Sequence, residues 1–333
     1  MQKTALRRTV LMLALAAASS GVLAQKAGAQ PAKAAPWPTK PLKLMVGFPG
    51  GSTPDLVART IAEPLSRALG QPVVVENRPG AGGNIAADVV ARATDQHTIG
   101  VMINGNMTIA KLLNPATPFD PLKDLAPISL IGTAPLLLTA PANAPFNNAQ
   151  EFFLAARNAG DKWSYGTPGV GTVGHIGMEL LKTKTNMSAV HVPYPGNPQV
   201  INAMISGQIQ LSLLPPGLAA AQIRAGKLKA VGVTSVNRSP LVPEYPSLDE
   251  GGVRGFQLEI WTAAAAPASM PKPIINKLSA LISEIARSPE VRQKLFQQGW
   301  QVAGTSAEGL ANRIKSDTNL LGGVIAMRNI KAE

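Results

Sequence analysis

The sequence predicts an α/β protein made of two similar lobes. Short apolar runs that suit strands alternate with helical patterns, which is typical of α/β architectures with largely parallel sheets. A succession of strand, glycine-rich loop and helix begins near residue 42 and begins again in the second half of the chain. The length of 333 residues also suits roughly two domains of about 150 residues each.

The first repeat contains three predicted strands joined by helices. Apolar runs predict strands over 42–46, 73–75 and 98–103. One helix opens at Asp55, carries apolar residues along one side and ends at Gly70. A second helix follows the next glycine loop and continues through Ala93.

The second repeat follows the same order. Its strands are predicted over 129–139, with an interruption at Pro135, and over 163–166, 189–192, 209–214 and 229–234. Its helices are predicted over 150–160, 175–184, 198–206 and 218–225. Helical patterns then dominate from Ile274 to Ile325.

Residues 1–24 are expected to form a secretory signal peptide that is removed on export. Three basic residues precede an apolar run over 10–18, and small residues stand at the cleavage site. The alternative, a membrane anchor, needs about 20 apolar residues, roughly twice this run. Cleavage after Ala24 and cleavage after Ala29 both fit, and residues 25–36 are expected to be a flexible leader.

Composition excludes several kinds of site. Because the chain has no cysteine, we expect no disulfide, thiolate metal site, cysteine nucleophile or lipid anchor on an N-terminal cysteine. The net charge is +12, but the basic residues are scattered and only 4% of residues are aromatic, so we expect no nucleic-acid binding. A basic surface can still attract anionic small ligands.

Three glycine-rich loops each follow a predicted strand and precede a predicted helix. They are Gly47–Asp55, Asn77–Asn84 and Tyr165–His175. Glycines let backbone N–H groups approach a ligand closely, and a helix N-terminus carries partial positive charge. Such loops can bind a carboxylate without an arginine, at the carboxyl ends of the strands. Turns alone would also explain any single one of these loops.

A nicotinamide cofactor is not expected. Gly169, Gly171 and Gly174 match the dinucleotide fingerprint G-x-G-x-x-G, directly after a strand. The fingerprint also needs an acidic residue about 20 positions further on to bind the ribose, and residues 191–194 contain none.

Catalysis finds little support in the sequence. No G-x-S-x-G elbow occurs, and the three histidines are isolated, without metal-ligand spacing. The nearest approach to a hydrolase is Thr172 with His175 and Glu179, but a threonine in mid-chain is a poor nucleophile. We therefore predict no catalytic residue, no cofactor and no bound metal.

At its glycine loops the sequence resembles the Bug-type solute-binding proteins, the periplasmic receptors of tripartite tricarboxylate transporters. The similarity runs from about Trp37 to the C-terminus. The motifs that carry it, in order, are WPTKPLKLMVGFPGGSTPDLVAR, LGQPVVVENRPGAGGNIAADVVA, FDPLKDLAPISLI, YGTPGVGTVGH, HVPYPG, IRAGKLKAVGVTSVNRSPLVPEYPSLDEGGVRGF and SPEVRQKLFQQGW.

The resemblance implies a type II-like periplasmic binding protein, with two α/β domains joined by crossing strands and a ligand cleft between them. Residues 37–134 and 260–333 would form domain one, and residues 135–259 domain two. It implies a receptor, expected as a monomer in the periplasm, that delivers a small organic carboxylate to membrane permease subunits. The alternative is a ligand-sensing partner of a membrane sensor kinase.

The resemblance also implies that backbone N–H groups, hydroxyls and bridging waters hold the ligand. From domain one it implies Phe48, Gly51, Ser52, Thr53, Asp55 and Asn104. From domain two it implies Thr167, Gly169, Gly171, Thr172 and His175, with Tyr194 and Pro195 at the lip. Position alone assigns two of these a structural part as well: Asp55 is expected to organise its loop, and His175 to cap its helix.

Three departures from the family pattern bear on the ligand. The Gly50-Gly51 pair stands one place earlier than usual, and residues 94–98 replace the usual P-D-G-Y-T. The stretch 197–207, where the family often has an aspartate, contains no acid. The last departure argues against an amino acid and for a plain acid or an uncharged group.

Overall fold

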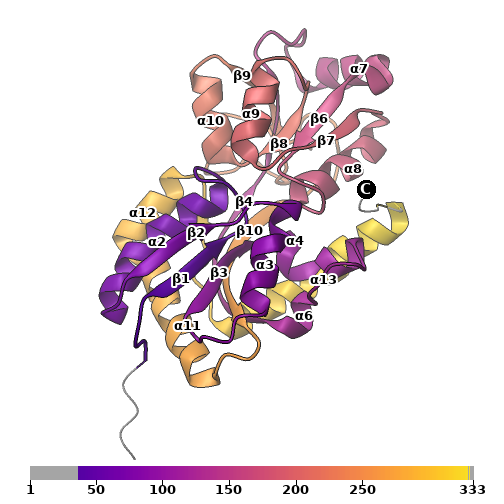
Figure 1. Cartoon of the computed structure of the whole chain (residues 1–333). Coiled ribbons are helices and arrows are strands. Elements are labelled where there is room, and N and C mark those ends of the chain that lie inside the picture. Colours follow the sequence, from indigo (N-terminus) through magenta and orange to yellow (C-terminus); the bar gives the residue numbers. More distant parts are fainter. Residues whose placement is uncertain (1–36, 329, 331–333) are drawn as a thin grey trace, which may run out of the picture. The chain divides into compact units, whose positions relative to one another are not determined.

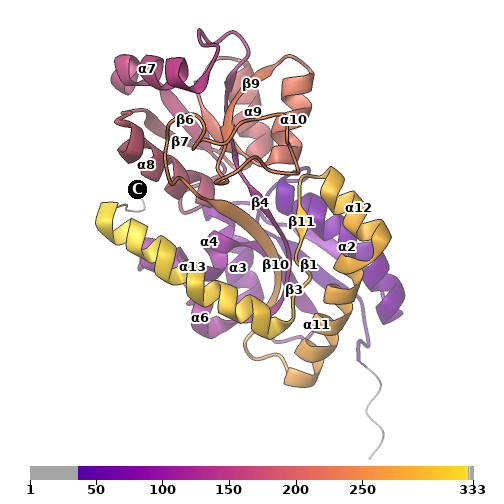
Figure 2. The same ribbon diagram turned by 180° about the vertical axis from the view of Figure 1, so that it is seen from behind.

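The computed structural model describes residues 37–328 and residue 330, so the expected signal peptide and flexible leader lie outside the described residues. The described residues from Lys40 onward belong to one compact unit, in which strands and helices gather in two lobes (Figures 1 and 2). No helix in this described part combines the length and apolar character that a membrane crossing requires.

The first lobe is built on a sheet of six strands in the order β11-β4-β10-β3-β1-β2. They are β1 (Leu42–Val46), β2 (Val73–Asn77), β3 (Thr98–Ile103), β4 (Leu125–Pro135), β10 (Glu259–Pro267) and β11 (Gln301–Val302). β1 pairs in parallel with β2 and β3, whereas β10 runs antiparallel to β3 and β4. The central strands are almost wholly buried because helices cover both faces.

Helices pack on both faces of this sheet. They are α2 (Thr53–Leu69), α3 (Asn84–Ala91), α4 (Asn104–Thr108), α5 (Ala110–Leu113), α6 (Pro121–Asp124), α11 (Lys272–Arg287), α12 (Pro289–Gln297) and α13 (Ala307–Arg328), with a 3₁₀ turn η1 (Ala81–Gly83). α2 packs with α11 and α12 on one face, and α3, α4 and α13 cover the other (Figures 1 and 2).

Helix α2 illustrates why these segments are helical. Pro54 and Asp55 occupy the first turn, where a missing N–H and a negative charge are both favourable. Val57, Ile61 and Leu65 recur at helical spacing and are fully buried. Gly70 then ends the helix in the left-handed conformation, with φ of 68°.

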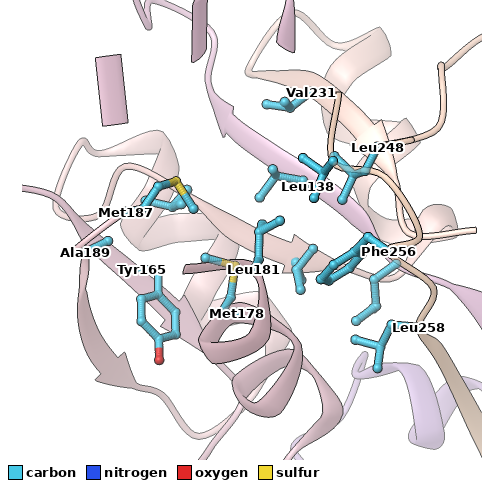
Figure 3. Close-up of a cluster of buried hydrophobic side chains, with 14 of the residues drawn as sticks. Leu138, Tyr165, Met178, Leu181, Met187, Ala189, Val231, Leu248, Phe256 and Leu258 are labelled. Atoms are coloured by element: carbon cyan, nitrogen blue, oxygen red, sulfur yellow. The ribbon is translucent and has the colours of Figure 1, made fainter. Parts of the chain in front are cut away.

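The second lobe contains two small sheets. β5 (Leu137–Pro141) lies between β8 (Ser212–Leu214) and β9 (Leu228–Val233) and is antiparallel to both, while β6 (Ser164–Thr167) pairs in parallel with β7 (Val190–Pro193). Its helices are α7 (Ala149–Ala159), α8 (Val173–Thr185), α9 (Asn197–Ile205) and α10 (Pro216–Arg224), with a 3₁₀ turn η2 (Gly160–Lys162). Its main core gathers Leu138, Met178, Leu181 and Phe256 (Figure 3).

The structure corrects the prediction of largely parallel sheets, because antiparallel pairs surround both β10 and β5. β10 has no counterpart among the predicted strands. Four of its residues, Ala263 to Ala266, are alanines, which have low strand propensity, so the pattern gave no strand signal there. The chain leaves the first lobe through β4 and returns through β10, so these two strands run in opposite directions.

Candidate ligand site

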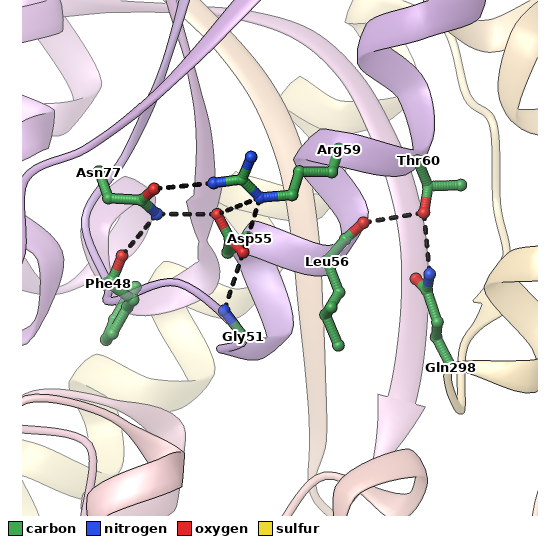
Figure 4. Close-up of polar contacts among 8 residues, drawn as sticks. All are labelled: Phe48, Gly51, Asp55, Leu56, Arg59, Thr60, Asn77 and Gln298. Atoms are coloured by element: carbon green, nitrogen blue, oxygen red, sulfur yellow. Dashed lines mark hydrogen bonds and ion pairs between the residues drawn. The ribbon is translucent and has the colours of Figure 1, made fainter.

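The carboxylate of Asp55 fixes the glycine loop of the first lobe. This side chain is buried and accepts hydrogen bonds from Gly51 N at 2.9 Å, Asn77 Nδ2 at 2.9 Å and Arg59 Nε at 3.0 Å (Figure 4). Asn77 Nδ2 also donates to the Phe48 carbonyl at 2.9 Å. Burial acts to raise the pKa of Asp55, but these hydrogen bonds hold it below its ordinary value. The carboxylate is therefore ionised and organises the loop.

The glycine loop of the second lobe is held by its own side chains. Thr172 Oγ1 donates to the Gly169 carbonyl at 2.8 Å and accepts from His175 N at 3.4 Å, which caps α8. His175 Nδ1 accepts in turn from Gly171 N at 3.3 Å. Gly169 and Gly171 have φ of +123° and +77°, a conformation that favours glycine. This loop keeps its shape without an acidic partner.

Three aromatic rings stack behind this second loop. The centroid of His191 lies 4.3 Å from that of His175 and 4.9 Å from that of Tyr165. His191 Nε2 also lies 2.7 Å from Thr167 Oγ1. Burial first, and the neighbouring His175 second, lower the pKa of His191 from 6.5 to about 4. The ring of His191 is therefore neutral at neutral pH.

Between the two loops lies a partly open space of about 50 Å³, called the inner cavity. Both lobes line it, through Phe48, Ser52, Thr53, Pro54, Ile103, Asn104, Leu136, Pro168, Thr172, Val173, Gly174, Asn197, Leu213, Pro215, Ile260, Trp261 and Trp300. None of these described lining residues carries a charge. The cavity therefore offers apolar walls with a few polar groups.

In the described part of the chain, four helices of at least nine residues begin at, or directly after, residues that line the inner cavity. They are α2 and, from the second lobe, α8, α9 and α10. Each helix N-terminus is equivalent to roughly half a positive charge. Four such ends around an otherwise uncharged space favour one anionic group there.

Four of the residues that line the inner cavity have a buried polar atom without a hydrogen-bond partner within the described residues. These atoms are Ser52 Oγ, Asn104 Oδ1, Asn197 Oδ1 and Trp300 Nε1. A buried polar atom left without a partner costs about 1–3 kcal/mol. A bound ligand can remove this cost, so these atoms make the cavity the candidate binding site.

A second, larger space of about 670 Å³ lies at the lip of the two lobes and is called the outer groove. It is lined by residues 79–82, 84, 105, 106, 110, 113 and 114 of the first lobe and by residues 168–171 and 193–195 of the second. The loop Asn77–Asn84 thus contributes here rather than to the inner cavity. None of the described residues that line the groove is charged.

Glycines and a polar side-chain contact are among the places where the two lobes touch, besides the packing of α13 on α8. A Cβ atom on Gly82 would lie 2.5 Å from the Val170 carbonyl oxygen, and one on Gly169 would lie 2.8 Å from Gly82 Cα. Asn197 Nδ2 of the second lobe donates to Thr53 Oγ1 of the first at 3.3 Å. Side chains at these glycines would hold the loops apart, so the glycines permit the lobes to close.

The predicted site residues fall into three groups. Those that line the inner cavity are Phe48, Ser52, Thr53, Asn104 and Thr172. Those that line the outer groove are Gly169, Gly171, Tyr194 and Pro195. Those that line neither are Gly51, Asp55, Thr167 and His175, whose polar atoms bond within the loops. Ligand contact stays a prediction for all three groups, and the residues of the third group also support their loops through these bonds.

Sequence reasoning missed several lining residues of the inner cavity. Asn197 directly follows the HVPYPG motif at the start of a helix, so its position was a usable signal. Trp261 and Trp300 lie far from the glycine loops in the sequence. Only the pairing of β10 with β3 and the course of the chain after α12 bring them to the cavity.

Comparisons with known proteins agree with this geometry. A family model for the tripartite tricarboxylate transporter family receptor matches residues 57–330. The UPF0065 protein in the tcbD-tcbE intergenic region of Pseudomonas sp. strain P51 is 33% identical over 314 residues, 94% of this chain and 91% of the relative. The structure of the periplasmic binding protein BugD is similar with a TM-score of 0.84 and 30% identity, covering 89% of this chain and all of that one.

A second solved structure contains a ligand. MatC from Rhodopseudomonas palustris with bound malate matches with a TM-score of 0.83 and 31% identity, covering 87% of this chain and 100% of that chain. The two-lobed fold of this chain is thus that of periplasmic binding proteins.

Proposed function

This chain belongs to the tripartite tricarboxylate transporter receptor family, and we propose that it captures a small organic carboxylate in the periplasm and delivers it to the membrane permease of such a transporter. The observation that carries the proposal is the inner cavity, where four helix N-termini surround an uncharged space. The malate held by MatC supports a carboxylate as the ligand class.

The binding mode follows from the polar groups of the inner cavity. The helix N-termini favour a carboxylate, and Ser52 Oγ, which has no partner among the described residues, can donate to one of its oxygens. A ligand bound there touches both lobes, because both line the cavity. It therefore stabilises the closed state over the open state by the contacts that exist only when the lobes meet.

We take residues 37–134 with 260–333, and residues 135–259, as the two bodies that move during closure. β4 and β10 connect them, and the glycine contacts at Gly82 and Gly169 allow the lips to meet. The permease would then bind the closed, ligand-loaded form.

Capture without chemistry is part of the proposal. The hydroxyl of Thr172 donates to the Gly169 carbonyl, and His175 Nδ1 accepts from a backbone N–H. Glu179 accepts from Tyr165 and from Lys182. These bonds support a structural role for the three residues, rather than nucleophile, base and orienting acid.

A thermal-shift screen of the purified protein tests the proposal. Mono-, di- and tricarboxylates, aromatic acids, amino acids and neutral amides are compared, and at least one carboxylate class should raise the melting temperature by mass action. The double variant Ser52→Ala/Thr53→Ala should weaken binding of that acid by about 1–3 kcal/mol through lost polar partners.

Ser316→Ala, at an exposed position on α13, is the matched control and should bind as the wild type does. A protein that no carboxylate stabilises would contradict the proposed function. Turnover of an ester or amide panel that is lost in His175→Ala would contradict capture without chemistry.

A further inference from the structure

Two tryptophans line the inner cavity, but their indole N–H groups are in different states. Trp261 Nε1 donates to Asp317 Oδ2 of α13 at 2.6 Å. Trp300 is 2% exposed, and its Nε1 has no partner among the described residues. A buried indole N–H usually has an acceptor. Trp300 is therefore the tryptophan that can donate to a ligand.

Two asparagine side-chain oxygens need a hydrogen-bond donor rather than an acceptor. Asn104 Nδ2 donates to the Glu259 carbonyl at 3.2 Å, and Asn197 Nδ2 donates to Thr53 Oγ1 at 3.3 Å. These bonds fix both amides, and each leaves its Oδ1 buried without a partner among the described residues. An amide oxygen can only accept, so it needs an O–H or N–H from the ligand or from water. A plain carboxylate offers neither.

The charge and size of the inner cavity narrow the ligand further. No described lining residue carries a charge, so a second carboxylate would be buried without a counter-ion. A ligand ammonium group would likewise lack an acidic partner in the lining. The volume of the inner cavity, about 50 Å³ against about 670 Å³ for the outer groove, favours a compact ligand.

We propose, on the basis of the receptor function proposed above, that the ligand is a compact hydroxy monocarboxylate. Its carboxylate accepts from Trp300 Nε1 and Ser52 Oγ at the helix N-termini. Its hydroxyl donates to the Oδ1 of Asn104 or of Asn197, and a bound water donates to the other. This ligand matches each unpartnered atom of the cavity with a group of opposite kind.

The first test compares matched acids by calorimetry on the wild-type protein. The pairs are glycolate with acetate, lactate with propionate and 3-hydroxybutyrate with butyrate, and malate, succinate and lactamide are added. At least one hydroxy acid should bind about tenfold or more tightly than its deoxy partner, which is about 1.4 kcal/mol. It should also bind more tightly than the two dicarboxylates and the neutral amide.

Substitutions then test which protein group binds which part of the ligand. The first concerns the carboxylate. Trp300→Phe keeps an aromatic wall but removes the donor, so it should weaken a hydroxy acid and its deoxy partner by the same factor, about tenfold. Trp163→Phe, outside the cavity lining, should leave both affinities and the ligand-induced change in tryptophan fluorescence unaltered.

The asparagine variants test the hydroxyl. Asn104→Leu or Asn197→Leu should reduce the preference for the hydroxy acid to less than about twofold, while exposed Asn202→Leu on the same helix as Asn197 should retain it. Because the preference is a ratio within one variant, a general loss of closure cancels.

The results separate the two proposals. If acids bind but deoxy acids or dicarboxylates bind as well as hydroxy acids, the hydroxy monocarboxylate is wrong and the receptor function stands. If both asparagine variants keep the full preference, the assigned acceptors are wrong and the inference is overturned. If no acid binds at all, the receptor function fails, and the inference fails with it.

Discussion

The two glycine loops that face each other across the inner cavity are supported in different ways. In the first lobe, the buried carboxylate of Asp55 ties its loop to Arg59 and to Asn77 at the end of β2. In the second lobe, Thr172 and His175 hold their loop from within, in front of a stack of rings. One support is ionic and links two segments, whereas the other uses side chains of the loop itself.

Because their supports differ, the two loops lose stability through different changes. The ionic support fails when its single buried charge is removed, because several donors then lose their acceptor together. The local support is divided among individually weaker hydrogen bonds, so each substitution there should cost less. We expect this support to be more sensitive to mild acid, because His191, whose pKa is lowered to about 4, stacks on His175 and lies 2.7 Å from Thr167 Oγ1.

Removing the Asp55 charge should give the largest effect. Asp55→Asn keeps the size of the side chain but replaces an acceptor oxygen with an NH₂ group facing donors. We expect the free energy of unfolding to fall by about 2–3 kcal/mol, with weaker ligand binding because the loop loosens. Urea unfolding and calorimetry measure the two effects.

Asp88→Asn is the matched control for Asp55→Asn. Asp88 also pairs with an arginine four residues later, Arg92, at 2.7 Å, but this pair lies nearer the surface. Its loss should cost less than about 0.5 kcal/mol and leave binding unchanged. Equal losses for the two aspartates would show that Asp55 acts only as an ordinary helix-surface ion pair.

The local support of the second loop should give an intermediate effect. Thr172→Val keeps the shape of the side chain but removes both the cap of α8 and the bond to Gly169. We expect a loss of about 1–2 kcal/mol of stability and weaker binding. Asn148→Ala, which removes the cap of α7, should cost about 1 kcal/mol without changing affinity. Unchanged binding in Thr172→Val would show that the α8 cap does not contribute to ligand binding.

The sequence predicts the parts of this comparison that are local. Strand, glycine loop and helix follow one another in the order expected, and β1 and β3 have the predicted bounds. Ser52, Thr53 and Thr172, which the family resemblance implies as ligand-binding residues, stand at helix starts next to glycines, a pattern visible over a few residues. Their contact with ligand stays a prediction.

The parts that depend on pairing over long distances are not predictable in this way. Asn77 was assigned to its own glycine loop, but its side chain serves Asp55 and Phe48 on the neighbouring one. Trp300 becomes a cavity wall only after the chain has returned through β10, an alanine-rich strand without a β signal. The Asp55 support and the tryptophan donor thus arise from the tertiary fold.

The smallest effect we predict is a difference between the loops in mild acid. The folded protein protonates His191 only near pH 4, whereas the unfolded chain does so near pH 6.5. As the pH falls from 6.5 towards 4, the unfolded state binds more protons, so stability that is fully present above pH 6.5 is progressively lost. We expect about 1 kcal/mol of this loss between pH 7 and pH 5, allowing for the partial exposure of the ring.

Urea midpoints at pH 7 and pH 5 check this loss in the wild type, His191→Gln and the control His97→Gln. The decline should shrink in His191→Gln and persist in His97→Gln. The Asp55 support behaves differently, because a carboxylate with a lowered pKa keeps its contribution until the pH falls below its ordinary value of 3.8. A decline that is the same in all three proteins would mean that the ring stack does not make the second loop the more acid-sensitive of the two.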